Sequence, residues 1–117
     1  MSSTFNVGIA GFDFTPAIHP KYGAWGTTPG MTEVDMPLLG RCVALAHGET
    51  KILWYGLDLV GENPEPTDVH RDDVAAAVGL SRDQIIWSTS QTHSGGAWPG
   101  SQRTGNSITD LTEQDAA

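Results

Sequence analysis

The feature that most constrains the fold is an apolar strand, a helix and a second apolar strand in direct succession. Residues 51–60 form a nearly continuous apolar run, which predicts a strand that is buried on both faces. Residues 67–78 carry a helical pattern, with Thr67 as the predicted N-cap and Gly79 at the end. Residues 85–90 are rich in β-branched side chains and too short a run for a helix. Such a unit normally joins two parallel strands by a right-handed crossover, so both strands should end at the same edge of a sheet.

A hairpin and an N-terminal strand complete the expected sheet. Residues 39–46 form an apolar run that the turn-like sequence 47–50 joins to residues 51–60, which is the pattern of a β-hairpin. Residues 5–14 alternate in the manner of a strand, and Pro16 then removes a backbone donor. We therefore expect an α/β fold whose mixed sheet contains a β-hairpin and a β-α-β unit.

Two stretches of the chain show no periodicity. Residues 17–37 contain several prolines and glycines and are expected to form a long loop, of the kind that is usually functional or mobile. Residues 97–117 are polar and rich in Gly, Ser and Thr, and we expect them to be disordered or to begin an incomplete element. A chain of 117 residues is long enough for one small domain. We expect residues 1–117 to form a single partial domain.

Charge and composition exclude several classes of partner. Six Lys and Arg residues against 14 Asp and Glu residues give a formal net charge of −8, which repels nucleic-acid phosphates and anionic lipid surfaces. The sequence contains neither a signal-peptide pattern nor an apolar run long enough to cross a membrane. These features predict a cytoplasmic protein with no nucleic-acid partner and no transmembrane segment.

The residues best suited to chemistry lie in the loop that follows residues 85–90. Residues 91–96 read Gln-Thr-His-Ser-Gly-Gly, and small residues let a ligand approach the backbone and leave amide donors free. His93 is either a ligand or metal contact or an exposed residue of a turn. Ser94 either donates to a ligand or orders the turn. A dyad of the two is not expected, because adjacent side chains usually diverge.

Two charged residues interrupt the apolar strands. Asp58 lies near the end of the run 51–60 and needs partners, because an unpaired buried carboxylate is costly. It is either functional or accepts backbone hydrogen bonds from the Gly61 loop. Arg41 either extends to solvent or pairs with a buried anion, such as Asp58 or a ligand. Because parallel strands end at one edge, Asp58 and the loop of His93 are expected to be neighbours.

Four segments, taken together, resemble the start of the neutral/alkaline ceramidase family. They are residues 7–16, 40–45, 57–61 and 92–95, which read VGIAGFDFTP, GRCVAL, LDLVG and THSG. The likeness extends from about residue 6 to residue 96. Its most specific part is the Thr-His-Ser-Gly sequence directly after a predicted strand.

The resemblance implies a zinc-dependent amidohydrolase that cleaves the N-acyl bond of ceramide. In such an enzyme the metal activates the attacking oxygen and polarises the carbonyl. His93 would then be a catalytic residue or a metal ligand, with Asp58 as a second catalytic candidate. Substrate binding is expected from Arg41, Ser94 and Gly95.

One position departs from the family pattern. The family usually carries His-Thr-His-Ser-Gly, with the first histidine as a zinc ligand, whereas Gln91 occupies that position here. An amide oxygen is a weaker zinc ligand than imidazole, so a metal would be lost, exchanged or held with the help of His93.

The sequence therefore leads to one preferred and one alternative function. The preferred function is that of the N-terminal part of a larger hydrolase domain, which acts on a small-molecule or lipid-like amide. This part is expected to require a C-terminal remainder or a partner chain. The alternative is a truncated, non-catalytic protein that binds a partner or is a relic without the metal site, and Gln91 favours it.

Overall fold

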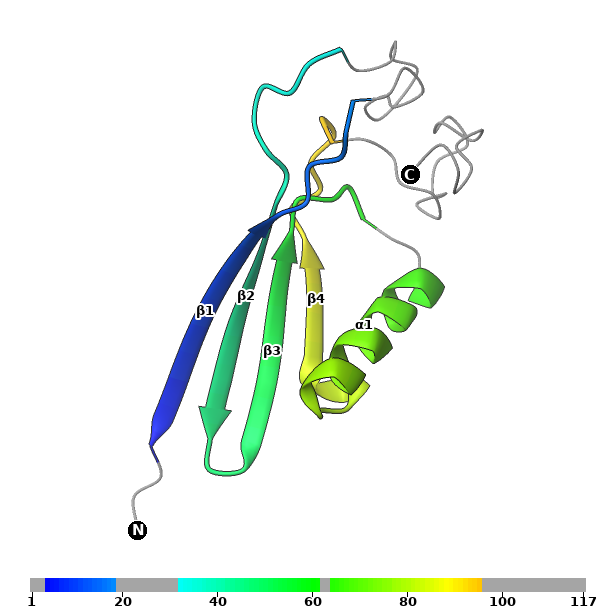
Figure 1. Ribbon diagram of the computed structural model, residues 1–117. Helices are drawn as coiled ribbons and strands as arrows, with labels where there is room; N and C mark the ends of the chain where they lie inside the picture. Colours follow the sequence, from blue (N-terminus) through cyan, green and yellow to red (C-terminus); the bar gives the residue numbers. More distant parts are fainter. Residues whose placement is uncertain (1–3, 19–31, 62–63, 96–117) are drawn as a thin grey trace.

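One four-stranded sheet and one α-helix make up the described part of the chain in the computed structural model (Figure 1). That part covers residues 4–18, 32–61 and 64–95 of the 117-residue sequence. The elements along the chain are β1 (Phe5–Asp13), β2 (Leu39–His47), β3 (Thr50–Leu57), α1 (Pro64–Val78), the short 3-10 helix η1 (Arg82–Gln84) and β4 (Ile85–Thr89). The expected α/β class with a mixed sheet is confirmed. Residues 19–31 and 97–117, on which most of the two loop predictions fall, lie outside the described residues.

β1, β2 and β3 are antiparallel neighbours, and the predicted hairpin is confirmed. β1 pairs with β2 from Phe5 opposite His47 to Asp13 opposite Leu39. β2 leads into β3 through a tight turn in which Gly48 has a φ of 59°. Glycine adopts a positive φ without the steric cost of a Cβ, and short hairpin turns need such a residue. The glycine in the turn therefore fits the paired register of β2 and β3.

β3, α1 and β4 form the predicted β-α-β unit. β4 pairs with β3 in parallel, from Ile85 beside Leu53 to Thr89 beside Leu57. Just beyond the strands, the backbone N–H of Ser90 donates to the carbonyl of Leu57 at 2.9 Å. Both strands therefore end at the same edge of the sheet, where open α/β sheets bind ligands.

Two predicted boundaries of this unit are wrong. α1 begins at Pro64 instead of residue 67, so Thr67 lies inside the helix and is not its N-cap. Prolines fit the first helical turn because its backbone N–H groups have no partner within the helix. β3 ends at Leu57 instead of Val60, because the N–H of Leu59 donates to the Leu57 carbonyl at 2.9 Å and turns the chain out of the sheet.

α1 is fastened to the start of β4 by Arg71. Its Nε donates to the carbonyl of Ile85 at 2.9 Å, and a terminal nitrogen donates to the carbonyl of Arg82 at 3.0 Å. Its other terminal nitrogen contacts Asp68 at 3.1 Å. Arg82 in turn donates from Nε to Asp72 Oδ1 at 2.7 Å, and this hydrogen bond holds the pKa of Asp72 below its usual value.

Neither α1 nor any other helix of the described residues is long and apolar enough to cross a membrane.

One face of the sheet, the covered face, packs against α1. Residues opposite one another in neighbouring strands share a face, so Leu53 of β3 lies beside Ile85 of β4, and Tyr55 lies beside Trp87. Ile85 is 0% exposed, and Leu57 is buried as well. His70 of α1 stacks on Trp87 with ring centroids 5.7 Å apart. Figure 1 shows α1 beside β4, at the far side of the sheet from β1.

The other face carries no helix in the described part of the chain, and we term it the open face. Its large apolar residues are Phe5, Val7, Ile9, Leu39, Val43, Leu45, Ile52, Trp54 and Ile86. Ile9 is 78% exposed and Trp54 is 49% exposed. The prediction that residues 51–60 are buried on both faces is therefore wrong for the described residues, because α1 covers one face only.

Candidate functional site

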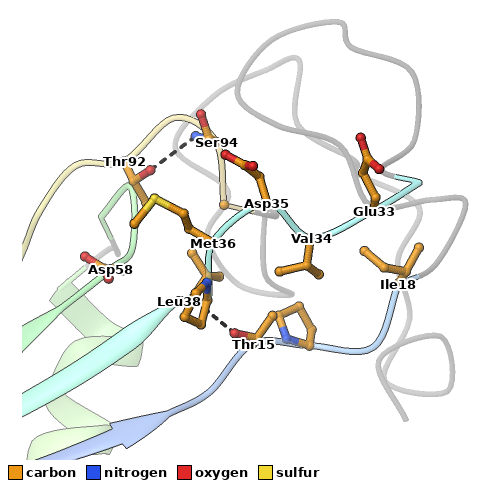
Figure 2. A pocket seen from close by; sticks show the side chains of 13 residues that line it. Thr15, Ile18, Glu33, Val34, Asp35, Met36, Leu38, Asp58, Thr92 and Ser94 are labelled. Atoms are coloured by element: carbon orange, nitrogen blue, oxygen red, sulfur yellow. Dashed lines mark hydrogen bonds between the residues drawn. The ribbon is translucent and has the colours of Figure 1, made fainter.

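A cavity of about 600 Å³ lies at the edge of the sheet where β2 begins and where β3 and β4 end (Figure 2). Its walls come from the segments after β1, before β2, after β3 and after β4. The described residues that line it are Thr15, Pro16, Ile18, Glu33, Val34, Asp35, Met36, Pro37, Leu38, Asp58, Thr92, Ser94 and Gly95. Because ligands of α/β sheets bind at this edge, the cavity is the candidate site.

Asp58 enters the cavity wall directly after β3 and is held by Leu39 at the start of β2. Its backbone N–H donates to the Leu39 carbonyl at 3.0 Å, and its Oδ2 accepts a hydrogen bond from the Leu39 N–H at 3.0 Å. The sequence suggested the Gly61 loop as a source of backbone donors, whereas this donor belongs to the neighbouring strand. The half-buried Asp58 therefore fixes the spacing of two segments that line the cavity.

Thr15 holds the segment after β1 against the segment before β2. Its Oγ1 accepts a hydrogen bond from the N–H of Leu38 at 2.8 Å, and the N–H of Phe14 donates to the Leu38 carbonyl at 3.0 Å. The N–H and the hydroxyl of Thr15 donate to Asp13 Oδ1 at 2.8 and 2.6 Å. These hydrogen bonds hold the pKa of the Asp13 carboxyl below its usual value. A short hydrogen-bonded chain thus positions one wall of the cavity.

The loop after β4 brings three small or short side chains to the cavity. Gln91 has a φ of 60°, which is uncommon for a residue other than glycine, and it turns the chain just past the strand. The N–H of Ser94 donates to Oγ1 of Thr92 at 3.3 Å (Figure 2). A Cβ on Gly95 would lie 3.2 Å from Cδ2 of Leu38, so this position favours glycine. The loop therefore packs against the segment before β2.

The structure brings some of the predicted site residues together and not others. Asp58, Ser94 and Gly95 line the cavity, so the expected proximity of Asp58 to this loop is observed. His93 belongs to the same loop, but its side chain is exposed and is not among those that line the cavity. Arg41 lies on β2 and does not line the cavity either.

Arg41 lies on the open face between two glycines. It is opposite Gly11 of β1 and Gly56 of β3. A Cβ on Gly56 would meet nothing within 4 Å, so there is open space beside the Arg41 side chain. Of the two alternatives that the sequence left, extension to solvent fits better, because Arg41 is exposed and Asp58 is bonded to Leu39.

The sequence did not reveal the apolar side of the cavity. Ile18, Val34 and Met36 belong to the predicted loop 17–37 and line the cavity. In Figure 2, Ile18 lies at the opposite end of the cavity from Asp58. The length of the loop was the sequence feature that indicated a functional role for these residues, because long loops without periodicity are often functional. That signal does not say which residues of the loop face a ligand.

The cavity combines apolar walls with carboxylates. Glu33, Asp35 and Asp58 line it, and the described lining residues include no lysine or arginine. Carboxylates accept hydrogen bonds and attract cations, whereas they repel anions. The cavity therefore suits an apolar molecule that carries N–H or hydroxyl donors, and it disfavours phosphates and carboxylates.

The zinc ion that the resemblance implies does not fit the described residues. A zinc site needs three or four His, Cys, Asp or Glu donors close together. Residues 4–18, 32–61 and 64–95 contain no group of three or more such residues that could hold a metal ion. Gln91 also offers an amide oxygen where the family has a ligand imidazole. We therefore assign no chemical step to zinc.

Comparison with known proteins gives no relative for this chain. No family model matches it, and neither the curated proteins nor the solved structures contain a significant match. The function therefore has to be inferred from the residues of the chain itself.

Proposed function

We propose that this chain forms the substrate-holding part of an amide hydrolase that acts on the N-acyl bond of a lipid-like molecule. The observation that carries the proposal is the cavity, in which Met36 lies beside Thr92 on the side of Asp58 and Ile18 lies at the opposite end (Figure 2). Ile18, Val34 and Met36 would contact an acyl chain, and burial of apolar surface contributes about 25 cal/mol per Å². The carboxylate of Asp58 would accept a hydrogen bond from the amide N–H or from a substrate hydroxyl.

The loop 92–95 supplies the remaining groups of the proposal. Hydrolysis of an amide develops negative charge on the carbonyl oxygen, and fixed hydrogen-bond donors stabilise that charge. The hydroxyl of Ser94 and the backbone N–H of Gly95 are the donors that we assign to this oxygen. The side chain of His93, on the same loop, is exposed and is not among those that line the cavity, so its assignment to stabilisation of the transition state rests on the family resemblance of the loop. Arg41 is left out of the site because it lies on the open face.

The proposal requires further groups beyond those described. A nucleophile and its activating base are not assigned among residues 4–18, 32–61 and 64–95. We assign them to a C-terminal remainder or to a partner chain, which would complete the hydrolase domain. Zinc belongs to the proposal only through donors that such a remainder adds. Ceramide is the substrate that the resemblance of the Thr-His-Ser-Gly loop suggests.

The first test is the binding of a short-chain ceramide to the 117-residue chain, measured by isothermal titration calorimetry. Asp58→Asn keeps an acceptor for the Leu39 N–H and removes the negative charge. Because hydrogen bonds to charged groups contribute about 1.5–3 kcal/mol, we expect Kd to rise roughly tenfold or more. Asp73→Asn removes the same charge from the exposed side of α1 and should leave Kd unchanged. Equal affinities of the wild type and Asp58→Asn would contradict the assignment of Asp58.

The second test measures fatty-acid release from the same ceramide by the natural gene product, with and without a chelator. His93→Ala should lower kcat by a factor on the order of 100 and leave Kd almost unchanged. His47→Ala, at the end of β2 remote from the cavity, is the control and should retain full kcat. The intact mass of the gene product is measured in parallel, and the proposal expects a mass well above 12.4 kDa.

A second candidate function is that of a non-catalytic protein that binds the same class of ligand. Gln91 favours it, because this residue replaces a ligand histidine of the family that the sequence resembles. This candidate predicts ceramide binding without hydrolysis by a gene product of about 12.4 kDa. Hydrolysis with an unchanged kcat in His93→Ala would contradict both candidates, since the first assigns transition-state stabilisation to His93 and the second predicts no hydrolysis.

A further inference from the structure

The open face consists of three apolar rows with charged positions at its two ends. Phe5, His47 and Thr50 share the first row, and the ring of Phe5 lies 6.2 Å from that of His47. The other two rows are Val7, Leu45 and Ile52, and then Ile9, Val43, Trp54 and Ile86. Beyond the third row lies Arg41, and beyond the first row lies the hairpin turn with Glu49.

We propose that the open face is the interface with a second copy of this chain. Two sheet faces rich in β-branched and aromatic side chains interdigitate well at a separation of about 10 Å. α1 already covers the opposite face of each sheet at β4, where His70 stacks on Trp87. Two copies joined through their open faces would therefore form four layers, helix, sheet, sheet and helix, with the apolar rows inside. A large exposed apolar patch on a protein usually marks such an interface.

The size of the open face is compatible with a dimer of moderate affinity. Four strands about 4.8 Å apart, each with about eight residues of about 3.3 Å, span roughly 500 Å² in projection. Side chains that stand out from the sheet add accessible area, which brings the face near the ~800 Å² per partner of standard interfaces. We expect a dissociation constant on the order of micromolar.

The charges at the two ends of the open face select one arrangement of the copies. Two-fold symmetry allows the strands of the copies to run in the same or in opposite directions. The same direction would place Arg41 against its own copy, and like charges oppose association. If the strands of the two copies run in opposite directions and the two-fold axis passes over the middle row, Arg41 lies against the hairpin turn of the second copy. That turn carries Glu49. The geometry therefore points to an antiparallel dimer with two Arg41 to Glu49 contacts.

Sedimentation equilibrium of the 117-residue chain tests this dimer. The expected mass is twice 12.4 kDa at high concentration, with dissociation to 12.4 kDa on dilution. Arg41→Glu should weaken the dimer by about tenfold to a hundredfold, because it places two carboxylates together. The double variant Arg41→Glu with Glu49→Arg restores the opposite charges and should recover most of the affinity.

A matched control separates the interface from the loss of net charge. Lys51→Glu changes the net charge by the same amount, but Lys51 pairs with Ala46 on the covered face and should leave the dimer unchanged. Far-ultraviolet circular dichroism of each variant verifies that it folds. A monomer at all concentrations, open-ended assembly, or a dimer that Arg41→Glu leaves intact would overturn the proposal. Failure of the double variant to recover affinity would also overturn the antiparallel arrangement.

Discussion

The two faces of the sheet contrast sharply, although the same four strands form both of them. On the covered face, α1 buries Ile85 completely and Arg71 ties the helix to the strand backbone. On the open face, Ile9 and Trp54 keep much of their surface in contact with solvent. The buried apolar side chains of the described residues are Leu57, Ala75 and Ile85, and all three belong to β3, α1 and β4. The open face can then serve association without taking part in the core.

The largest expected effect comes from equal truncations on the two faces. Ile85→Ala should lower the free energy of unfolding by about 2–4 kcal/mol at any protein concentration, because it leaves a cavity in the core. Ile9→Ala removes the same atoms from an exposed position and should cost less than about 0.5 kcal/mol when the chain is monomeric. Urea denaturation at several protein concentrations measures the free energy of unfolding of both variants. Equal losses in dilute solution would remove the distinction between the faces.

A second pair of variants compares two glycines of the sheet. Gly40 lies under the ring of Phe12, and a Cβ there would overlap that ring. Gly40→Ala should therefore cost about 1–3 kcal/mol through overpacking. Gly56→Ala, on the open face, meets nothing within 4 Å and should cost nothing. In a double-mutant cycle, Phe12→Ala should remove most of the cost of Gly40→Ala, and additive effects would contradict the packing of that ring.

A third comparison concerns the two arginines that join α1 to η1 and β4. Arg71→Ala removes hydrogen bonds to two carbonyls, of Ile85 and Arg82, and should cost about 1–2 kcal/mol. Arg82→Ala removes an exposed ion pair with Asp72 and should cost less, since solvent screens such pairs. Thermal unfolding of the two variants in low and high salt distinguishes the two contributions to stability. The loss in Arg82→Ala should vanish in high salt, and that in Arg71→Ala should persist.

The smallest expected effect is a pH dependence at the cavity wall. The pKa of Asp13 is lowered below 3.8 in the folded chain by the hydrogen bonds from Thr15. Its stabilising contribution is therefore present above pH 3.8 and is lost as the pH falls through the folded pKa. The amide resonances of Thr15 and Leu38 should shift together in this acidic range. Asp13→Asn should abolish the shift, and a shift that persists would assign it to another group.

The sheet was predictable because its signals are local. Apolar runs of strand length, a glycine turn at Gly48 and a helical pattern before residue 78 each depend on neighbours in sequence. The start of α1 was misplaced because proline is common both in loops and in the first turn of a helix, and Pro64 and Pro66 belong to that first turn. The open face escaped prediction for a different reason. An apolar run such as residues 51–60 has the same sequence whether or not another layer covers it.

The cavity was predictable only in its position. Parallel strands imply a common edge, so Asp58 and the loop of Ser94 could be placed near one another. The other walls depend on hydrogen bonds between distant residues, Thr15 with Leu38 and Asp58 with Leu39. Such pairs leave no periodic trace in a sequence. For this reason the apolar residues that line the cavity could be identified from the structure and not from the sequence.

The central claim is that the cavity, and not the open face, holds an apolar amide. The most direct measurement is an amide-resonance titration of the 117-residue chain with short-chain ceramide, followed by nuclear magnetic resonance. We expect saturable shifts at Leu38, Asp58 and Ser94, with little change at Val7 and Val43. Shifts confined to the open face, or no shifts at saturating ceramide, would contradict it.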